Sequence, residues 1–306
     1  MHSLSHSLPL QVARPKRLVW GIAIAVCLPW PVRAAEAEQP EASSIFARDN
    51  LVAWCVVPFD ASKRTPASRA KMLRGFGFKK LAYDWRDPHV PTFEKEIVEC
   101  KKQGIEFFAF WGWHPSIEPL IQKYDIHPQI WMLARSPEAP TQQAKIEASA
   151  RSLESLVEKT RKLGLKFGLY AHGDWGGEPD NLVSVCRYLR EHDHADHVGI
   201  VYNFHHGHGH IKDFPHALAE MKPYLLCLNL NGMNATGDPL IMPIGSGEYE
   251  RQMMQDVVAS GYRGPIGVIH HREQLDAEEG LRQNIEGLKK VLNSMGDTRA
   301  AESYRN

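Results

Sequence analysis

A pattern that repeats from residue 51 onward constrains the fold more than any other feature of the sequence. Short apolar runs alternate there with amphipathic segments of helical length. Eight of these runs are predicted to be buried strands: 51–59, 79–85, 105–113, 129–134, 165–171, 197–204, 224–230 and 264–270. The amphipathic segments predict helices at 66–75, 92–104, 141–163, 179–191, 213–222, 248–260 and 276–294. Strands joined through helices are parallel, with right-handed crossovers.

The number of repeats selects one architecture within this α/β class. A chain of 306 residues could form two small domains or one barrel of roughly 250 residues. No linker composition interrupts the alternation, so a single domain is expected. The sequence therefore predicts a closed (β/α)8 TIM barrel over residues 50–295, followed by a polar C-terminal tail at 296–306.

The N-terminal segment has a different composition from the barrel. It reads "RPKR" at 14–17, then an apolar run at 18–30, then small residues in "VRAAEA" at 32–37. That order is typical of a secretory signal peptide, here 1–37 with cleavage near 34–37, and a retained anchor is the alternative. The apolar run is too short to span a bilayer comfortably, so no stable membrane insertion is expected. We predict an exported protein, periplasmic or extracellular, with residues 38–49 as a lead-in segment.

Composition excludes several classes of partner and cofactor. The 36 basic and 36 acidic side chains balance, which leaves no electrostatic reason to expect nucleic acid. The glycine-rich stretches "GDWGGEP" and "GSGEYE" lack the context of a phosphate loop, so no nucleotide cofactor is expected. No C-x-x-C motif occurs, and buried free thiols are predicted for the four cysteines beyond the signal: Cys55, Cys100, Cys186 and Cys227.

Polar side chains follow most of the predicted strands. In a barrel of this kind the reacting groups come from the carboxyl ends of the strands and the loops after them. The stretch "YNFHHGHGHI" (202–211) lies at such an end. Candidates at these ends are Asp60, Asp84, Arg86, Trp113, His114, Arg135, His172, Asp174, Asn203, His205, His206, Asn229, Asn231, His270 and His271. Any one of them could be merely solvated, but histidines from several strands converge. Nearby tryptophans either stack on a sugar ring or pack the rim: Trp85, Trp111, Trp113 and Trp175.

Four segments at these ends resemble one known family. They are "LKFGLYAHGDWGG" (165–177), "VGIVYNFHH" (198–206), "LCLNLNG" (226–232) and "PIGSGEYERQMMQDVVASGYRGPIGV" (243–268). Together they resemble the xylose isomerase-like TIM barrel superfamily, which includes sugar isomerases and epimerases of the sugar phosphate isomerase/epimerase type. The resemblance extends over about residues 50–292, and the last segment is the most specific.

The resemblance implies a divalent cation held by carboxylates and a histidine, which stabilises an enediolate. His172 and His206 match the family pattern. The expected glutamate of the fifth strand is Tyr170, and the expected glutamate of the eighth is Ile269. Asparagines occupy the other two ligand positions, at 203 and 229. The usual metal carboxylates are therefore replaced.

Two arrangements of the site remain open. A histidine set of His172, His206 and His270, joined by Asp174 or His205, would suit zinc or a manganese- or cobalt-like ion. Without metal, one histidine would act as base and another as acid, with Arg135 or Asn229 stabilising an enolate oxygen. We predict as catalytic His172, His206, Asp174 and Arg135. We predict as substrate-binding Trp113, His114, Asp84, Asn203, Asn229, Asn231 and Trp175.

These residues predict an exported sugar isomerase/epimerase-like enzyme. It would abstract a proton beside a carbonyl of a sugar or keto-sugar, which leads to isomerisation, epimerisation or elimination. The alternative is a non-catalytic carbohydrate-binding barrel that has lost the metal site. A glycoside hydrolase needs two opposed carboxylates, and no spacing selects a pair among Asp60, Asp84 and Asp174. The missing carboxylates and the neutral charge also argue against a DNA-repair endonuclease of the same superfamily.

Overall fold

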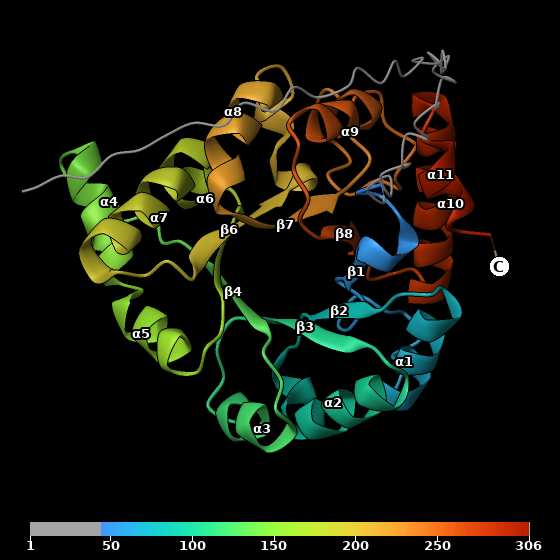
Figure 1. The fold of residues 1–306 in the computed structure, drawn as a ribbon, viewed down its shortest axis with the longest axis horizontal. Helices are drawn as coiled ribbons and strands as arrows, with labels where there is room; N and C mark the ends of the chain where they lie inside the picture. Colours follow the sequence, from blue (N-terminus) through green and yellow to red (C-terminus); the bar gives the residue numbers. More distant parts are fainter. Residues whose placement is uncertain (1–43, 306) are drawn as a thin grey trace, which may run out of the picture. The chain divides into compact units, whose positions relative to one another are not determined.

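The computed structural model describes residues 44–305. Its eight strands are all parallel and pair in chain order, and β8 pairs with β1, which closes the barrel (Figure 1). The predicted architecture is thus confirmed. The strands are β1 (Leu51–Trp54), β2 (Lys80–Tyr83), β3 (Glu106–Trp111), β4 (Gln129–Leu133), β5 (Phe167–Tyr170), β6 (Val198–Asn203), β7 (Leu225–Leu230) and β8 (Ile266–Ile269). The predicted signal peptide lies outside the described residues.

Helices surround the strands, as Figure 1 shows. They are α1 (Pro66–Gly75), α2 (Phe93–Lys102), α3 (Ile117–Tyr124), α4 (Gln142–Arg151), α5 (Glu154–Lys162), α6 (Asp174–Gly177), α7 (Pro179–Asp193), α8 (Phe214–Met221), α9 (Glu250–Ala259), α10 (Ala277–Met295) and α11 (Thr298–Glu302). Short 3-10 turns are η1 (Arg48–Asn50), η2 (Asp87–Thr92), η3 (Phe204–His206), η4 (His208–His210) and η5 (Lys222–Tyr224).

Two helices differ from the sequence expectation. The single helix predicted at 141–163 breaks into α4 and α5, and the Ser152 hydroxyl at the break donates to the Ser149 carbonyl. A serine that bonds the preceding turn competes with the regular helical ladder. Helix α3 had no predicted range, although its buried Ile117 and Ile121 are spaced four residues apart.

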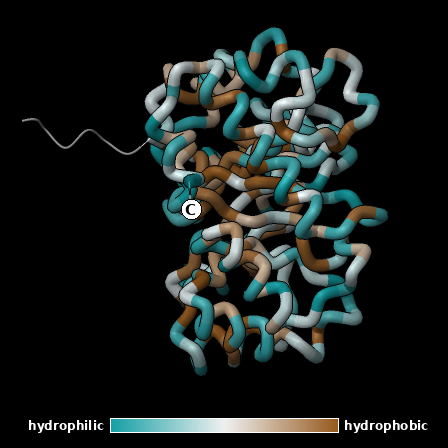
Figure 2. Tube along the Cα trace, turned by 90° about the vertical axis from the view of Figure 1, so that its right-hand side faces the viewer, coloured by the Kyte–Doolittle hydropathy of each residue, from teal (hydrophilic) through white to brown (hydrophobic). Residues whose placement is uncertain are grey.

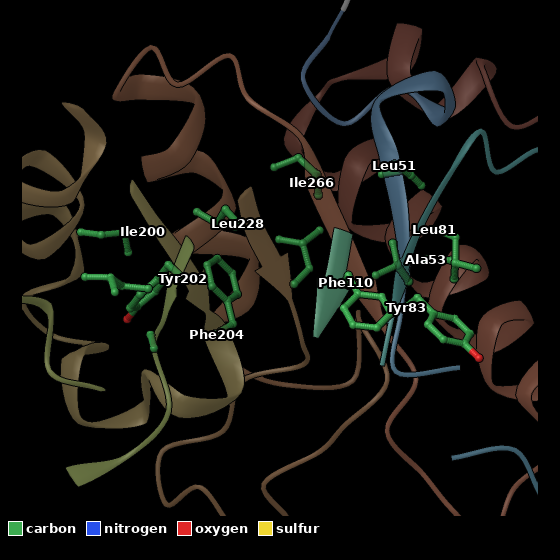
Figure 3. Packing of buried hydrophobic residues seen from close by; sticks show 14 of the residues in the cluster. Leu51, Ala53, Leu81, Tyr83, Phe110, Ile200, Tyr202, Phe204, Leu228 and Ile266 are labelled. Carbon is green, nitrogen blue, oxygen red and sulfur yellow. The ribbon is translucent and has the colours of Figure 1, made fainter. Parts of the chain in front are cut away.

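Apolar side chains form two layers, one on each side of the strands. The outer layer lies between strands and helices and includes the outward-facing residues of β1, β2, β6, β7 and β8 shown in Figure 3. The inner layer fills the barrel. Because side chains alternate along a strand, nearly continuous apolar runs supply both layers. Figure 2 shows hydrophobic stretches through the middle and hydrophilic ones at the periphery.

Large aromatic side chains fill the barrel interior. Trp54 contacts Trp131 at 4.9 Å between ring centroids, and Trp111 contacts Tyr170 at 4.8 Å. The Trp54 indole N–H donates to the Tyr170 hydroxyl at 2.9 Å. Gly168 makes this packing possible, because a Cβ there would lie 3.0 Å from the Trp131 ring. The interior is a packed aromatic core beneath the carboxyl ends of the strands.

The segments before β1 and after α10 pack against the barrel. Ile45 and Phe46, in the predicted lead-in segment, are buried. The polar tail forms α11, and Tyr304 beyond it is also buried. The Tyr304 hydroxyl donates to the Phe46 carbonyl at 2.5 Å. These buried residues, Ile45 and Phe46 before β1 and Tyr304 after α11, anchor the two mainly polar segments at the amino-terminal end of the barrel.

Cys55, Cys100, Cys186 and Cys227 are all buried free thiols, as predicted. Over residues 44–305 no helix combines the length and apolar character needed to cross a membrane.

Candidate functional site

The four positions at which the family resemblance expected other metal ligands divide into an apolar pair and a polar pair. Tyr170 and Ile269 belong to the apolar interior. Asn203 and Asn229 are opposite each other in register on β6 and β7, and neither is exposed. The Asn229 amide N–H donates to the Asn203 side-chain oxygen at 2.6 Å, and the Asn203 amide donates to the Ala171 carbonyl at 2.8 Å. These amides satisfy one another and the backbone.

Histidines from three strand ends gather one step further out. His172 follows β5, His205 and His206 form η3 after β6, and His271 follows β8. Ring centroids are 4.1 Å apart for His172 and His206, 3.9 Å for His205 and His206, and 6.0 Å for His205 and His271. The structure thus brings together His172 and His206, two of the predicted site residues. We call these four residues the histidine cluster.

Three histidines of the cluster, His205, His206 and His271, are kept neutral by their surroundings. Burial, with the neighbouring His172, lowers the pKa of His206 to about 3. Burial, with Arg86 nearby, lowers the pKa of His271 to about 4. Burial and the adjacent rings hold the pKa of His205 well below its usual value. A neutral imidazole has one donor and one acceptor nitrogen, so near pH 7 these three rings can bond hydroxyl and carbonyl groups without carrying charge.

The backbone beneath this cluster is strained. His271 has φ +39°, Cys55 has φ +56° and Asp174 has φ +52°. Residues other than glycine seldom adopt such positive φ values. The three residues follow β8, β1 and β5. The His271 backbone N–H donates to the Cys55 carbonyl at 3.2 Å, so two of the strained residues support each other. Strain of this kind is frequent at functional sites.

His270, predicted as a metal ligand, faces the other way. Its ring is buried against α10, since a Cβ on Gly280 would lie 2.0 Å from its Nδ1. Ile269 fills the inside of the barrel, and alternation therefore turns His270 outward and His271 back toward the mouth. The choice of His270 alongside His172 and His206 was wrong in this respect. Strand parity was the signal that could have selected His271.

Asp84 is the most perturbed carboxylate described at the mouth. It follows β2 and is 1% exposed. Its Oδ1 accepts the Val57 backbone N–H at 3.3 Å, while its Oδ2 has no hydrogen-bond partner. Burial raises the pKa of Asp84 to about 7, against the opposing effect of Arg86. A carboxyl group that titrates near neutral pH with one free oxygen is suited to proton transfer.

Other predicted residues have structural partners or lie on the rim. The Asn231 amide donates to the Gly232 and Leu240 carbonyls, so it shapes the loop after β7. The Trp175 indole donates to Gln142 at 2.9 Å. Arg135 and Asp174 are exposed, with no side-chain hydrogen bond or ion pair among residues 44–305. Their catalytic roles stay predictions.

The two candidates after β3 lie among aromatic and helical neighbours. His114 contacts the Trp85 ring at 5.2 Å and the Phe93 ring at 5.6 Å. The Lys159 ammonium lies 5.3 Å from the Trp113 ring. Lys159 belongs to α5, so this ring is engaged by the helix layer. Their roles in substrate binding also stay predictions.

A cavity of about 510 Å³ adjoins the histidine cluster without including it. Its lining comes from the segments after β1 and β2, including Asp60, Lys63, Arg64, Arg69 and Arg86. The Arg86 guanidinium lies 5.4 Å from the Phe59 ring, which lies 3.9 Å from the ring of His271 in the cluster. Arg86 therefore borders the cavity and, through Phe59, the histidine cluster. The sequence placed Arg86 at a strand end but assigned it no role.

The fold and this site define a (β/α)8 barrel with its polar residues at the carboxyl ends of the strands. The chain belongs to the xylose isomerase-like TIM barrel family, whose model matches residues 76–291. A search of curated proteins finds no match.

Solved structures share the fold at low identity. L-ribulose 3-epimerase has a TM-score of 0.60 at 12% identity, over 83% of this chain and 95% of that one. The 3-keto-D-glucoside 4-epimerase YcjR from E. coli has a TM-score of 0.59 at 15% identity, over 80% and 99%. The IOLI protein with a binding zinc atom has a TM-score of 0.58 at 12% identity, over 79% and 98%.

The donor set of this chain does not fit the family's metal site. The ligand positions at the ends of β5 and β8 hold Tyr170 and Ile269, which cannot replace carboxylates for a hard cation. Among the described residues, no group of three or more His, Cys, Asp or Glu side chains is arranged to hold a metal ion. The histidine rings pack beside one another instead of converging on one point.

Proposed function

We propose that the protein is an exported sugar isomerase/epimerase-like enzyme that transfers a proton beside a carbonyl of a small sugar or keto-sugar. Isomerisation, epimerisation and elimination share this first step. Family membership supports the proposal, and so do the epimerases among the structures with this fold. The observation that carries it is Asp84, a buried carboxyl group that follows β2 and has a pKa of about 7.

Asp84 is assigned as the proton-transfer group. A base is most effective when its pKa is near the working pH, because it is then available and still strong enough to take the proton. His206, with a pKa of about 3, is neutral but a poor base. The free Oδ2 of Asp84 would take the proton, while the Val57 N–H holds Oδ1 in place.

The histidine cluster is assigned to the developing enolate oxygen. A neutral imidazole N–H stabilises an oxyanion by hydrogen bonding and does not need to give up its proton. His206, which is half-buried and held neutral, is assigned as this donor. His172 is exposed and lies in ring contact with His206, so the substrate can reach both side chains. Each can also bond a substrate hydroxyl.

The decisive experiment is solvent deuterium exchange on a panel of aldoses, ketoses and keto-sugars. The wild type should incorporate deuterium at the carbon next to the carbonyl. Asp84→Asn should reduce the exchange rate by about a hundredfold or more, as for loss of a general base. Asp196→Asn is the matched control, because Asp196 is exposed in the turn that precedes β6. Equal exchange in Asp84→Asn would remove Asp84 from the mechanism.

A non-catalytic carbohydrate-binding barrel is the second candidate. The replacement of both glutamate positions by Tyr170 and Ile269 favours it. It predicts that sugars bind with no exchange in any variant. Metal content measured on the folded wild type and on a His172→Ala, His206→Ala double mutant addresses the metal alternative. A stoichiometric metal lost only in the mutant would contradict the metal-free assignment.

Export is proposed from the N-terminal sequence alone. Expression of the full chain in a secreting bacterium, followed by N-terminal sequencing of the released protein, should give a start near residues 34–37. Recovery of the intact chain from the cytoplasm would contradict this proposal.

A further inference from the structure

The cavity beside the histidine cluster is lined by more basic than acidic side chains. Four cationic side chains line it, Lys63, Arg64, Arg69 and Arg86, against one carboxylate, Asp60. Arg64 pairs with Asp60 at 2.8 Å and also with Asp276 and Glu278, and Arg69 pairs with Glu96, so the charges of these two arginines are balanced. The positive charge that remains at the cavity is that of Lys63 and Arg86, and it attracts anions.

Two of the cations have no carboxylate partner. Neither Lys63 nor Arg86 forms an ion pair within residues 44–305, in contrast to Arg64. The Arg86 guanidinium donates to the Asp84 and Trp85 carbonyls, which holds it in place but does not neutralise its charge. An arginine fixed by neutral carbonyls can still bind a carboxylate or phosphate.

Arg69 contributes a buried donor that lacks a partner. Its side chain is 2% exposed, and its Nη1 donates to Glu96 at 2.7 Å. Its Nε has no hydrogen-bond partner, although it lies in a residue that lines the cavity. Unpaired buried donors cost free energy, and a bound anion or water would remove that cost.

The amino terminus of α1 borders the same cavity. Thr65, the N-cap, and Pro66, the first helical residue, both belong to the lining. The helix has 10 residues, and its positive end adds to the potential of Lys63 and Arg86.

We propose that this cavity is a subsite for an anionic group of the substrate, a carboxylate or a phosphate. This inference rests on the proposed function, because it takes the histidine cluster to be the place where the sugar reacts. Arg86 connects the two, through Phe59, which lies against His271. The substrate is therefore an acidic or phosphorylated sugar, with its anionic group among Lys63, Arg69 and Arg86.

The test is direct binding, measured by calorimetry on the mature protein. The probes are D-glucose, D-glucuronate, D-glucose 6-phosphate and inorganic phosphate. At least one anionic sugar should bind about tenfold or more tightly than glucose, the gain expected from charge-assisted hydrogen bonds. Glucuronate against glucose 6-phosphate distinguishes a carboxylate site from a phosphate site, and added salt should weaken the preference.

Single substitutions in the cavity wall test whether the anionic probe binds there. Lys63→Gln and Arg86→Gln should each reduce binding of the anionic probe about tenfold. Lys71→Gln on the exposed side of α1 should leave it unchanged. Lys63 is exposed, so its variant serves if Arg86→Gln fails to fold. Equal binding of glucose and the anionic sugars, no binding of any probe, or a preference that both folded variants retain would overturn the subsite.

The outcome is independent of catalysis. Selective anion binding without deuterium exchange would retain the subsite and reject the enzyme. Exchange on neutral sugars with no anion preference would retain the enzyme and reject the subsite.

Discussion

Asp84 links catalysis to stability at the scale of one residue. Its pKa in the folded protein is about 7, above the ordinary 3.8, so the folded state holds the proton more tightly than the unfolded chain. Stability should therefore fall as the pH rises from about 4 through 7 and stay lower above it. The difference between the two pKa values corresponds to a loss of at most roughly 4 kcal/mol in the free energy of unfolding.

Asp84→Asn should consequently stabilise the protein at alkaline pH. The asparagine oxygen can still accept the Val57 N–H, but no buried charge forms. We expect a higher melting temperature than the wild type at pH 8 and a much smaller difference at pH 5, measured by calorimetry. A difference that does not depend on pH would contradict the raised pKa.

The pH dependence of wild-type activity should follow the ionisation of Asp84. If ionised Asp84 is the base, kcat/KM should rise with pH and level off above about 7, because this parameter reports the free enzyme. A profile with its rise near pH 4 would assign proton transfer to an ordinary carboxylate instead.

At the scale of elements, α10 fixes the direction of His270. Gly280→Ala places a methyl group 2.0 Å from the buried His270 ring, and overpacking of this kind costs about 1–3 kcal/mol. Gly75→Ala is the control, because nothing lies within 4 Å of a Cβ there. That substitution should be neutral or stabilising by up to about 1 kcal/mol. Urea unfolding compares them, and equal stability of both variants would contradict this packing.

The loops after β5 and β6 are joined by a pH-dependent contact. The His210 Nε2 lies 2.7 Å from the Glu178 carboxylate. Burial alone would lower the pKa of His210, but the bonds to Glu178 and Asp213 outweigh it and raise the pKa. The raised pKa means that this contact stabilises fully below pH 6.5 and is lost as the pH rises through the folded-state value.

Hydrogen exchange should detect this contact in η4. After correction for intrinsic rates, amides of 208–210 should lose protection as the pH rises above 6.5, by less than about 1 kcal/mol because Glu178 is exposed. Glu178→Gln should remove most of this pH dependence. Protection that is constant across this range in the wild type would contradict the pairing.

At the scale of the molecule, the described chain ends close the barrel opposite its mouth. The Arg48 backbone N–H donates to Ser303 at 3.0 Å, and Tyr304 bonds Phe46. Deletion of residues 297–306 should cost roughly 3 kcal/mol or more, or about 6–12 °C in Tm, through lost burial. Substrate KM should not change at low temperature, because the site lies at the other end. A changed KM with unchanged Tm would contradict this separation.

The sequence was sufficient for the barrel because its evidence is local. Each strand shows as an apolar run and each helix as a period of three to four residues, and eight repeats leave little choice of topology. The pairing of His172 with His206 followed from family positions and strand ends in the same way. Local evidence was weakest where the chain departs from periodicity, at the break after Arg151 and in the short helix α3.

Only the tertiary structure decided which polar residues face one another and how they are charged. His270 and His271 are adjacent in sequence, and strand parity together with the packing of α10 turns one outward and the other into the cluster. Asp84 is an ordinary aspartate in sequence, and its pKa near 7 arises from burial in the folded protein. Side-chain direction and dielectric surroundings are set by contacts between elements, whereas the repeat that builds the barrel is written residue by residue along the chain.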